Sequence, residues 1–532
     1  MNINWTEQQA LDLLRKALSV DGATGQAIAP FMKEDLEDEA YVSLYSESDP
    51  AQMSLLKDLP RQTAQQVNHE FVLVDRYGNH KTKASFAANA LPAEANIDGS
   101  KKNVQLKLYG KTSAVQGLTV LQNTIKALGQ SDIAGANDAA VKLLMQYQIN
   151  AEVFHGDTRD TLDTNGFKGV FQLIDELTKS PSATTSFSNG DIFIDMRGQP
   201  LLPDGKKGIR SQAVAIGKRN GMMRRIYLAP ELLETLETNL DPSARFWIQG
   251  SQSGSNTKGL ILGNTIDGMR IQGGIVYFRR DNALSAFVKT SQEPNAVLIP
   301  GAPAQFAYSG GGGAGTFGTP AVNNSGVGKF QTTGERLTGV YYVVAALNDI
   351  GESIASGASA TVTAVAGKTV EFAIRPRGDE KSFKIYRAYT VDAAQPGTFM
   401  EPIDRAPKLI AEIPNGASLG NTTPITFIDD DHMLPGTTWA WGTDVNSDNA
   451  SAIDQGNTPS SPTNQYSLGR SAVALAQLTG LFEFDLAKLG WLHSNKLFAQ
   501  VLAPMVPRPW VNVVWFNVGG VEIKEQLLDR PA

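Results

Sequence analysis

Apolar residues recur at steps of three and four positions within residues 132–157, a spacing that predicts one long helix. The predicted apolar stripe consists of Ala136, Ala139, Ala140, Leu143, Leu144, Tyr147, Ala151 and Phe154. Four polar residues lie between its members: Lys142, Gln146, Gln148 and Asn150. Gly156 follows as a C-cap residue. A shorter amphipathic helix is predicted over residues 7–20.

The pattern before the long helix is extended. Residues 67–86 hold two β segments around the turn signal Gly78-Asn79, and residues 103–109 alternate polar and apolar side chains. These segments carry little apolar material, and two strands alone are marginally stable in water. We therefore expect this β region to need another surface to lie on.

Strand and helix patterns alternate after the long helix. Helices are predicted over residues 170–178, 212–219, 230–240 and 471–478, and strands over 191–196, 224–228 and 509–518. This alternation predicts an α/β domain whose sequence is interrupted and then resumes near the C-terminus.

The interrupting segment has a different pattern of predicted elements. Residues 341–347, 370–374 and 382–389 read as strands, and no helical period occurs among them. The glycine-rich residues 308–315 predict a flexible linker before them, and the polar residues 446–463 predict a second linker after them. We expect a β-sandwich, ending near residues 441–444, inserted into the host domain.

Composition narrows the possible classes of protein. A chain of 532 residues should form two or three domains. It has no cysteine, which excludes disulfides, thiolate metal sites and cysteine nucleophiles, and its net charge of −7 argues against a dedicated nucleic-acid binder. No secretory signal or bilayer-spanning segment is predicted. We expect a soluble protein made in a cytoplasm.

Motifs for catalysis or cofactor binding are weak. The five histidines have no metal spacing, and residues 429–431, three aspartates, are interpreted as a turn rather than a calcium site. The glycine run lacks the Gly-Lys-Ser/Thr ending and flanking elements of a phosphate loop, and no G-x-S-x-G motif is present. We expect no enzyme activity, no metal and no cofactor.

A cluster of basic residues, with no acidic residue within it, is the main charge feature: Lys206, Lys207, Arg210, Lys218, Arg219, Arg224 and Arg225. It could contact DNA or the acidic residues 33–39, which include Glu34 and Asp35, of another copy of the chain. The alternative is a solvated face.

The succession of motifs resembles one family. It comprises Asp-Arg-Tyr-Gly-Asn at residues 75–79, a strand at 104–110 ending Leu-Tyr-Gly, the long helix, Phe-Lys-Gly at 167–169 and Arg-Ile-Tyr-Leu-Ala-Pro-Glu-Leu at 225–232. Over about residues 1–295 and 450–532, this order resembles the major capsid proteins of tailed bacteriophages, which have the HK97-like fold.

The resemblance implies an α+β capsid fold with an inserted β-sandwich. Its parts would be an N-terminal arm (1–65), an extended β loop or E-loop (66–112), a peripheral domain with the spine helix (113–188), an axial domain (189–295 and 449–505), the insert (296–448), and a peripheral strand with the C-terminus (506–532).

The insert resembles a fibronectin type III or immunoglobulin-like domain. Residues 342–353 match the Y-x-V-x-A-x-N-x-x-G-x-S pattern, and residues 384–387 and 431–439 are similar to other segments of that family. The tyrosine strand comes early in this chain rather than near the end, so the strand order departs from the family pattern.

The capsid resemblance implies a structural protein that assembles with itself, as pentamers and hexamers, into an icosahedral shell around double-stranded DNA. It further implies non-specific DNA contact, portal and decoration proteins as partners, a virion location, synthesis in the host bacterial cytoplasm and no membrane. The candidate inter-subunit contacts are Arg76, Tyr77, Lys81, Lys83, Glu34, Asp35, Lys206, Lys207, Arg210, Lys218 and Arg219.

Two other functions remain open on the sequence. A carbohydrate-binding or adhesive protein with a sandwich module would normally carry a signal peptide or a catalytic carboxylate pair, and neither is visible. An intracellular α/β enzyme with an insertion would have a small-molecule pocket and form a monomer or small oligomer. The size of the particle in solution separates these functions from a shell.

Overall fold

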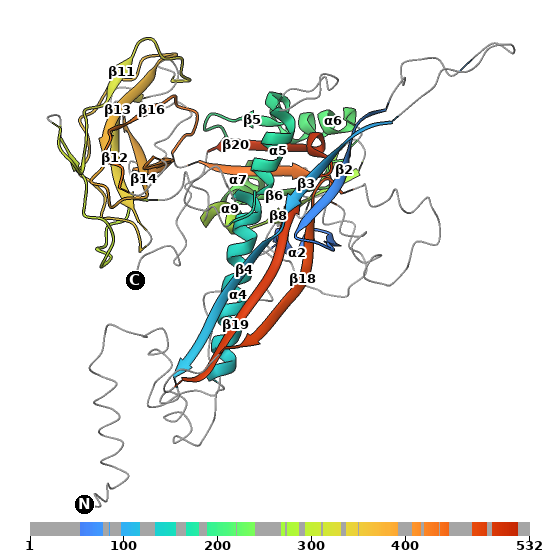
Figure 1. The fold of residues 1–532 in the computed structure, drawn as a ribbon. Coiled ribbons are helices and arrows are strands. Elements are labelled where there is room, and N and C mark those ends of the chain that lie inside the picture. Colours follow the sequence, from blue (N-terminus) through green and yellow to red (C-terminus); the bar gives the residue numbers. More distant parts are fainter. Residues whose placement is uncertain are drawn as a thin grey trace, which may run out of the picture. The chain divides into compact units, whose positions relative to one another are not determined.

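The protein is a mixed α/β chain with few helices (Figure 1). The computed structural model describes residues 54–77, 85, 97–116, 133–155, 166–179, 189–219, 221–239, 268–271, 274–286, 293–309, 312–330, 337–348, 350–391, 407–416, 420–435, 437–445, 471–486 and 492–519. The chain divides into two compact units, of which the larger comprises Glu47–Tyr109, Gln146–Gly480 and Gln500–Ala532. None of the described helices combines the length and apolarity needed to cross a bilayer.

The longest helix is α4 (Ile133–His155), which confirms the helix predicted from apolar periodicity. Asn150 lies between members of the predicted stripe but is fully buried, whereas Ala139 of the stripe is exposed. The C-terminal half is buried on several sides, so a single stripe does not describe its packing. Gly156, the predicted C-cap, lies outside the described residues.

One sheet has four strands, in the order β1 (Arg61–Thr63), β18 (Ala474–Asp485), β19 (Leu492–Met505) and β4 (Lys107–Gln116). The helix predicted over residues 471–478 is therefore wrong. Ala474, Leu475 and Ala476 are all buried, and a short apolar run buried on both faces does not distinguish a helix from a strand by its periodicity.

Part of the expected N-terminal arm is built into the larger unit. Helix α2 (Ser54–Asp58) buries Leu55 and Leu56, Leu59 is also buried, and β1 pairs in parallel with β18. Residues 54–63 are thus a packed segment of the larger unit, although the sequence resemblance places them in an N-terminal arm over residues 1–65. The helix predicted over residues 7–20 lies outside the described residues.

A second sheet has six strands, in the order β5 (Phe193–Asp195), β20 (Asn512–Val518), β17 (Thr438–Thr443), β6 (Arg225–Leu228), β8 (Gly274–Arg280) and β7 (Gly268–Ile271). Its neighbouring helices include α5 (Val170–Lys179), α6 (Ile209–Lys218), α7 (Pro230–Asn239) and α9 (Ala283–Ala286). Short 3-10 turns occur at Asn189–Asp191 and Pro509–Val511. The helices and strands predicted between residues 170 and 240 are confirmed, as is the strand near 509–518.

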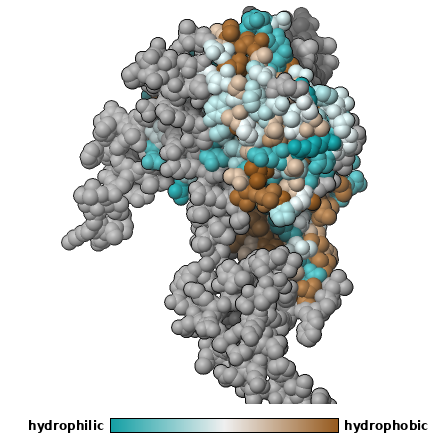
Figure 2. All heavy atoms as spheres, turned by 90° about the vertical axis from the view of Figure 1, so that its left-hand side faces the viewer, coloured by the Kyte–Doolittle hydropathy of each residue, from teal (hydrophilic) through white to brown (hydrophobic). Residues whose placement is uncertain are grey.

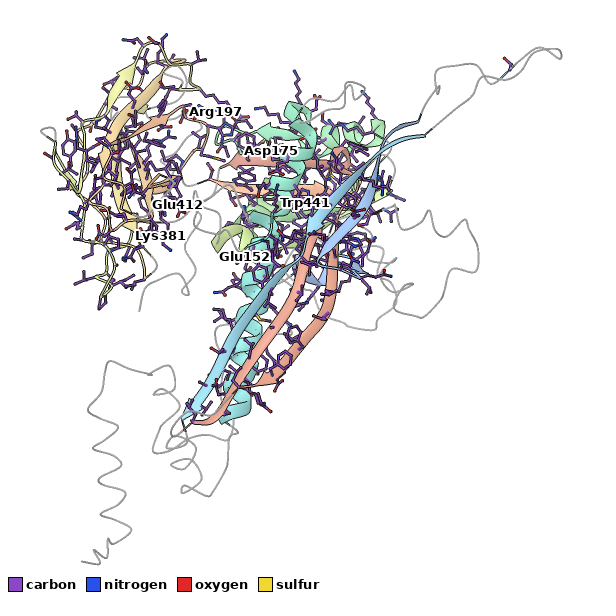
Figure 3. The ribbon with its side chains drawn as sticks, viewed as in Figure 1. Glu152, Asp175, Arg197, Lys381, Glu412 and Trp441 are labelled. Carbon is purple, nitrogen blue, oxygen red and sulfur yellow. The ribbon has the colours of Figure 1, made fainter. Side chains whose placement is uncertain are left out.

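The centre of this region is aromatic. Trp441 of β17, labelled in Figure 3, stacks on Tyr227 of β6, with ring centroids 5.3 Å apart. Phe154 of α4 meets Trp441 edge-on. Strand β17 is therefore part of the six-stranded sheet. This differs from the expected insert, whose boundary at residue 448 included β17.

Residues 307–429 form two further sheets, here called the two-sheet region. One contains β9 (Ala307–Tyr308), β10 (Thr316–Phe317), β11 (Ala321–Asn323), β13 (Thr369–Arg375) and β16 (Ile425–Asp429), and the other contains β12 (Leu337–Leu347), β14 (Ser382–Val391) and β15 (Lys408–Pro414). Tyr342, Phe372 and Phe383 come from both sheets and belong to one buried cluster. The strands predicted at 341–347, 370–374 and 382–389 are confirmed.

The glycine-rich segment expected as a flexible linker is partly folded. Phe306 and Phe317 flank the run and are buried in the shared cluster, and β9 pairs with β10. Gly312 and Gly315 have φ values of +82° and +74°, a conformation that glycine adopts without steric cost. The linker prediction is wrong for these described residues, because the paired strands β9 and β10 anchor both ends of the run, although Gly312, Gly313 and Ala314 themselves are exposed.

A two-stranded antiparallel sheet lies before β4. It consists of β2 (Asn68–Tyr77) and β3 (Ile97–Gln105), with Phe71 opposite Lys102 and Asn68 opposite Gln105. Strand β2 lies where an extended segment was predicted, but its partner is residues 97–105, which overlap the predicted strand 103–109 only at its start, and the returning strand predicted up to residue 86 lies, apart from residue 85, outside the described residues. The turn signal Gly78-Asn79 lies outside the described residues.

Candidate functional site

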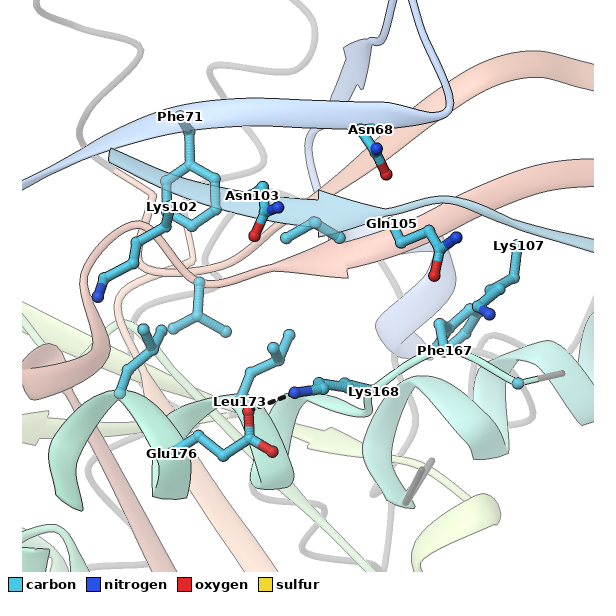
Figure 4. A pocket seen from close by; sticks show the side chains of 14 residues that line it. Asn68, Phe71, Lys102, Asn103, Gln105, Lys107, Phe167, Lys168, Leu173 and Glu176 are labelled. Atoms are coloured by element: carbon cyan, nitrogen blue, oxygen red, sulfur yellow. Dashed lines mark hydrogen bonds and ion pairs between the residues drawn. The ribbon is translucent and has the colours of Figure 1, made fainter. Parts of the chain in front are cut away.

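A groove of about 690 Å³ lies between the β2–β3 hairpin and helix α5. In Figure 4, Phe71 and Lys102 extend from the hairpin toward the helix that carries Leu173 and Glu176. Both walls belong to the larger compact unit. The groove is lined by Asn68, Phe71, Lys102, Asn103, Val104, Gln105, Lys107, Gly166, Phe167, Lys168, Leu173, Glu176, Leu177 and Val506.

The helix wall is fixed by local contacts. Phe167 is buried, its ring lies 4.9 Å from that of Tyr109, and its backbone N–H donates to Tyr109 Oη at 3.1 Å. Glu176 accepts from Gln172 at 2.8 Å and pairs with Lys168 at 2.7 Å. These contacts join the segment before α5 to the start of β4 and hold the carboxylate of Glu176 at the groove.

The charge of the groove is predominantly positive. Lys102, Lys107 and Lys168 line it, and Glu176 is its one acidic lining residue. Among the described residues, neither Lys102 nor Lys107 has an ion-pair partner. With apolar side chains and amides between the lysines, the groove suits an acidic, partly apolar segment better than a neutral small molecule.

The hairpin also exposes apolar side chains. Val67 is 51% exposed, Val72 is 61% exposed, and Leu108 at the start of β4 is 66% exposed. On the face of the molecule shown in Figure 2, apolar residues gather in separate patches among hydrophilic ones. A hairpin with apolar residues facing solvent is a surface that a further protein segment can cover.

Several predicted contact residues are not described in full. Arg76 and Tyr77 lie in β2, but their side chains are outside the described part of the chain. Lys81, Lys83, Glu34 and Asp35 lie outside the described residues altogether. The groove was not found by sequence reasoning, because its two walls come from segments far apart in the chain.

The basic cluster of residues 206–225 does not form one free patch. Three of its arginines have acidic partners: Arg210 pairs at 2.8 Å with Asp204, just before the cluster, whereas Arg224 pairs with Asp444 at 3.0 Å and Arg225 with Asp58 at 2.6 Å, both far away in the sequence. The cluster therefore carries less free positive charge than its sequence, which contains no acidic residue, would indicate.

Two further members of the cluster bind backbone carbonyls. Arg219 is buried, donates to Asp191 O at 2.9 Å, and has its pKa lowered by burial. Lys207 donates to Asp195 O. Lys206 and Lys218 are exposed. Five residues of this cluster were predicted as inter-subunit contacts, and Arg219 is buried inside the chain instead of lying on its surface.

The aspartates of residues 429–431 bind arginine. Arg387 Nη1 lies 2.6 Å from Asp429 Oδ2, and Arg387 Nη2 lies 2.7 Å from Asp431 Oδ1. Asp430, between them, is exposed. The described residues contain no group of three or more His, Cys, Asp or Glu side chains that could hold a metal ion.

A buried polar site was missed by the sequence reasoning. Asp281 is fully buried and accepts hydrogen bonds from Ser54 Oγ at 2.9 Å, Leu55 N at 3.1 Å and Asn150 Nδ2 at 3.0 Å. Asn150 Oδ1 also accepts from Leu56 N at 2.9 Å. Burial raises the pKa of Asp281 to about 6, although these hydrogen bonds oppose the rise. The site attaches residues 54–56 to helix α4.

No protein-family model and no curated protein matches this sequence. Among solved structures, the chain is similar to the capsid of cyanophage P-SCSP1u (7% identity, TM-score 0.39, 96% of this chain and 98% of that chain). It is also similar to the capsid of an empty GTA particle (7% identity, TM-score 0.39, 93% and 98%). A third is the holo-SrpI encapsulin complex of Synechococcus elongatus (7% identity, TM-score 0.35, 95% and 98%).

Proposed function

We propose that this protein is the major subunit of an icosahedral capsid that encloses double-stranded DNA in a tailed-phage virion. The observation that carries the proposal is the β2–β3 hairpin, which has no third strand among the described residues and exposes Val67 and Val72. A two-stranded sheet gains little stability alone. Its stability is completed by an adjacent copy, so folding of the hairpin and assembly are coupled.

Closed shells follow from this arrangement when each copy covers the same surface of the next. Such heterologous contacts repeat around rings, and rings of five and six close a shell. The order of a long hairpin, long helix and six-stranded sheet supports the proposal, since it matches the order of parts that the sequence resemblance implies.

Contact with DNA would be non-specific. The net charge of −7 and the neutralised arginines of the 206–225 cluster favour weak electrostatic contact through a few exposed lysines such as Lys206 and Lys218. The role is structural rather than catalytic, and portal and decoration proteins are further partners in the proposal. Synthesis takes place in the host bacterial cytoplasm.

The two-sheet region is, in the same proposal, an inserted fibronectin type III or immunoglobulin-like sandwich that projects from the outer surface. The shared buried cluster of its two sheets supports a self-contained core. Strands β6 and β8 come before it and β17 and β20 after it, yet all four pair in one sheet, which supports an insertion within a host domain.

The test is the state of the purified full-length protein, observed by sedimentation velocity and electron microscopy. We expect rings or closed shells that grow with protein concentration. A Val72→Glu variant should remain folded and shift the distribution toward monomers, whereas Val365→Glu, an exposed valine of the two-sheet region, should not. A wild-type protein that stays monomeric at all concentrations would contradict the proposal.

A further inference from the structure

We propose that the groove between the β2–β3 hairpin and α5 binds the acidic residues 33–39 of a second copy of the chain. The inference rests on the proposed function, since it names the partner of one contact in a self-assembling shell.

The groove offers cations without internal partners. Lys168 is engaged by Glu176 at 2.7 Å, but Lys102 and Lys107 line the same groove without an ion-pair partner in the described part of the chain. Both lysines are half-buried, so their ammonium groups are less well screened than those on an open surface. The electrostatic attraction of an incoming carboxylate is therefore stronger here than at a fully exposed lysine.

The lining between the lysines sets further requirements. Apolar side chains, among them Phe71, Leu173 and Val506, lie beside the amides of Asn103 and Gln105. A ligand that satisfies this lining carries several carboxylates, exposes backbone groups for the amides and places at least one apolar side chain among them. A free phosphate or a polyanion without apolar groups meets only the first requirement.

Residues 33–39, with the sequence Lys-Glu-Asp-Leu-Glu-Asp-Glu, have this composition. The run holds five acidic residues and one lysine in seven positions, with Leu36 at its centre. Side chains of an extended segment alternate between two faces, so Leu36 can enter the apolar part while Glu34 and Asp38, on the same face, reach Lys102 and Lys107. No seven-residue stretch outside residues 33–40 has as many acidic residues.

The competing basic surface is a poorer fit. In the 206–225 cluster, Arg210, Arg224 and Arg225 are already paired with acids, and Arg219 is buried. The remaining exposed lysines, Lys206 and Lys218, flank helix α6 and are not part of the groove. Charge complementarity therefore favours the groove over the cluster that the sequence alone suggests.

Site-specific disulfide formation tests the contact directly, because the native chain has no cysteine. A Leu36→Cys chain is mixed with a Lys107→Cys chain under mild oxidation, and heterodimers are measured by mass spectrometry. We expect at least tenfold more heterodimer than from Leu36→Cys mixed with Lys206→Cys. Equal yields in the two mixtures would overturn the inference. The inference would also be overturned if a Leu36→Cys/Lys107→Cys double variant formed its disulfide within one chain at every dilution.

A charge exchange gives an independent test. The Lys102→Glu/Lys107→Glu variant and the Glu34→Lys/Asp38→Lys variant should each assemble roughly tenfold more weakly than wild type, and an equimolar mixture of the two should recover assembly. Binding of the segment within its own chain predicts no recovery on mixing. Normal assembly of wild type and of both variants would overturn only this inference, whereas failure of wild type to assemble would count against the proposed function.

Discussion

Arg387 and Asp431 form a fully buried ion pair, with Arg387 Nη2 lying 2.7 Å from Asp431 Oδ1 and neither side chain exposed. The second oxygen of Asp431 pairs with Arg197 Nη2 at 2.7 Å. Arg197, labelled in Figure 3, follows β5 of the six-stranded sheet. Arg387 lies in β14 of the two-sheet region. One carboxylate therefore connects the two parts of the larger unit.

Unusual backbone conformations gather at the same junction. In the described part of the chain, the non-glycine residues with positive φ are Arg197 (52°), Asp431 (57°) and Asn517 (55°). Asn517 Nδ2 donates to His432 O at 2.9 Å, and Leu434 N donates to Asn517 Oδ1 at 2.9 Å. Such conformations cost of order 1 kcal/mol or more each and persist where surrounding contacts determine them.

Removing the charge of Asp431 should loosen this junction. In Asp431→Asn, Arg387 and Arg197 remain near an uncharged amide, and breaking a buried pair in this way costs about 3–5 kcal/mol of unfolding free energy. Asp430→Asn is the matched control, since Asp430 is exposed and should cost below about 1 kcal/mol. Urea unfolding of both variants measures the difference, and equal midpoints would contradict the structural role of Asp431.

The boundaries of the two-sheet region can be tested by deletion. Thr438 Oγ1 donates to Leu284 O at 2.7 Å, so the chain segments before and after the region lie side by side. Replacing residues 294–434 with a short Gly/Ser linker should leave a folded protein that still assembles, because β17 is retained. Deleting residues 300–445 removes β17 with the buried Trp441 and should give insoluble protein.

Circular dichroism and electron microscopy of the two deletion proteins decide this prediction. If both proteins fold, β17 is not required for the six-stranded sheet. If the 294–434 deletion protein folds but yields no particles, the two-sheet region is required for assembly and is not a dispensable projection.

Asp281 should make stability fall as pH rises. Burial raises its pKa from 3.8 to about 6, so the folded state holds a proton that the unfolded state has released in this range. The free energy of unfolding should therefore decrease by about 3 kcal/mol between about pH 4 and pH 6 through this group.

The Asp281→Asn variant should lack that component of the pH dependence. Asp204→Asn, at an exposed carboxylate, serves as its control and should retain it. Denaturant midpoints measured from pH 4 to pH 7 provide the comparison. Parallel pH profiles for wild type and Asp281→Asn would show that Asp281 does not titrate as stated.

The packed segment before β1 should contribute to stability. Leu55 is fully buried, so Leu55→Ala should lower the free energy of unfolding by about 2–5 kcal/mol. Leu298, which is 69% exposed, offers a control whose change to alanine should cost below about 1 kcal/mol. Thermal unfolding compares the two variants. An unchanged stability of Leu55→Ala would show that residues 54–59 do not contribute to the packed core.

The sequence by itself determined the elements whose apolar spacing is regular. The long helix α4, helices α5, α6 and α7, and strands β12, β13 and β14 follow from the pattern of apolar residues, although α4 and β12 bury side chains on more than one face. The change from α/β texture to β texture and back was also visible in the sequence.

Only the tertiary structure decided features that depend on residues far apart in the chain. Strand β18 was predicted as a helix because burial on both faces removes its period, and the glycine-rich run joined a core through Phe306 and Phe317. Two arginines of the basic cluster form ion pairs with Asp58 and Asp444, which lie far from the cluster in sequence. The groove beside α5 likewise exists only where the hairpin meets the helix, since burial and charge pairing are set by neighbours in space.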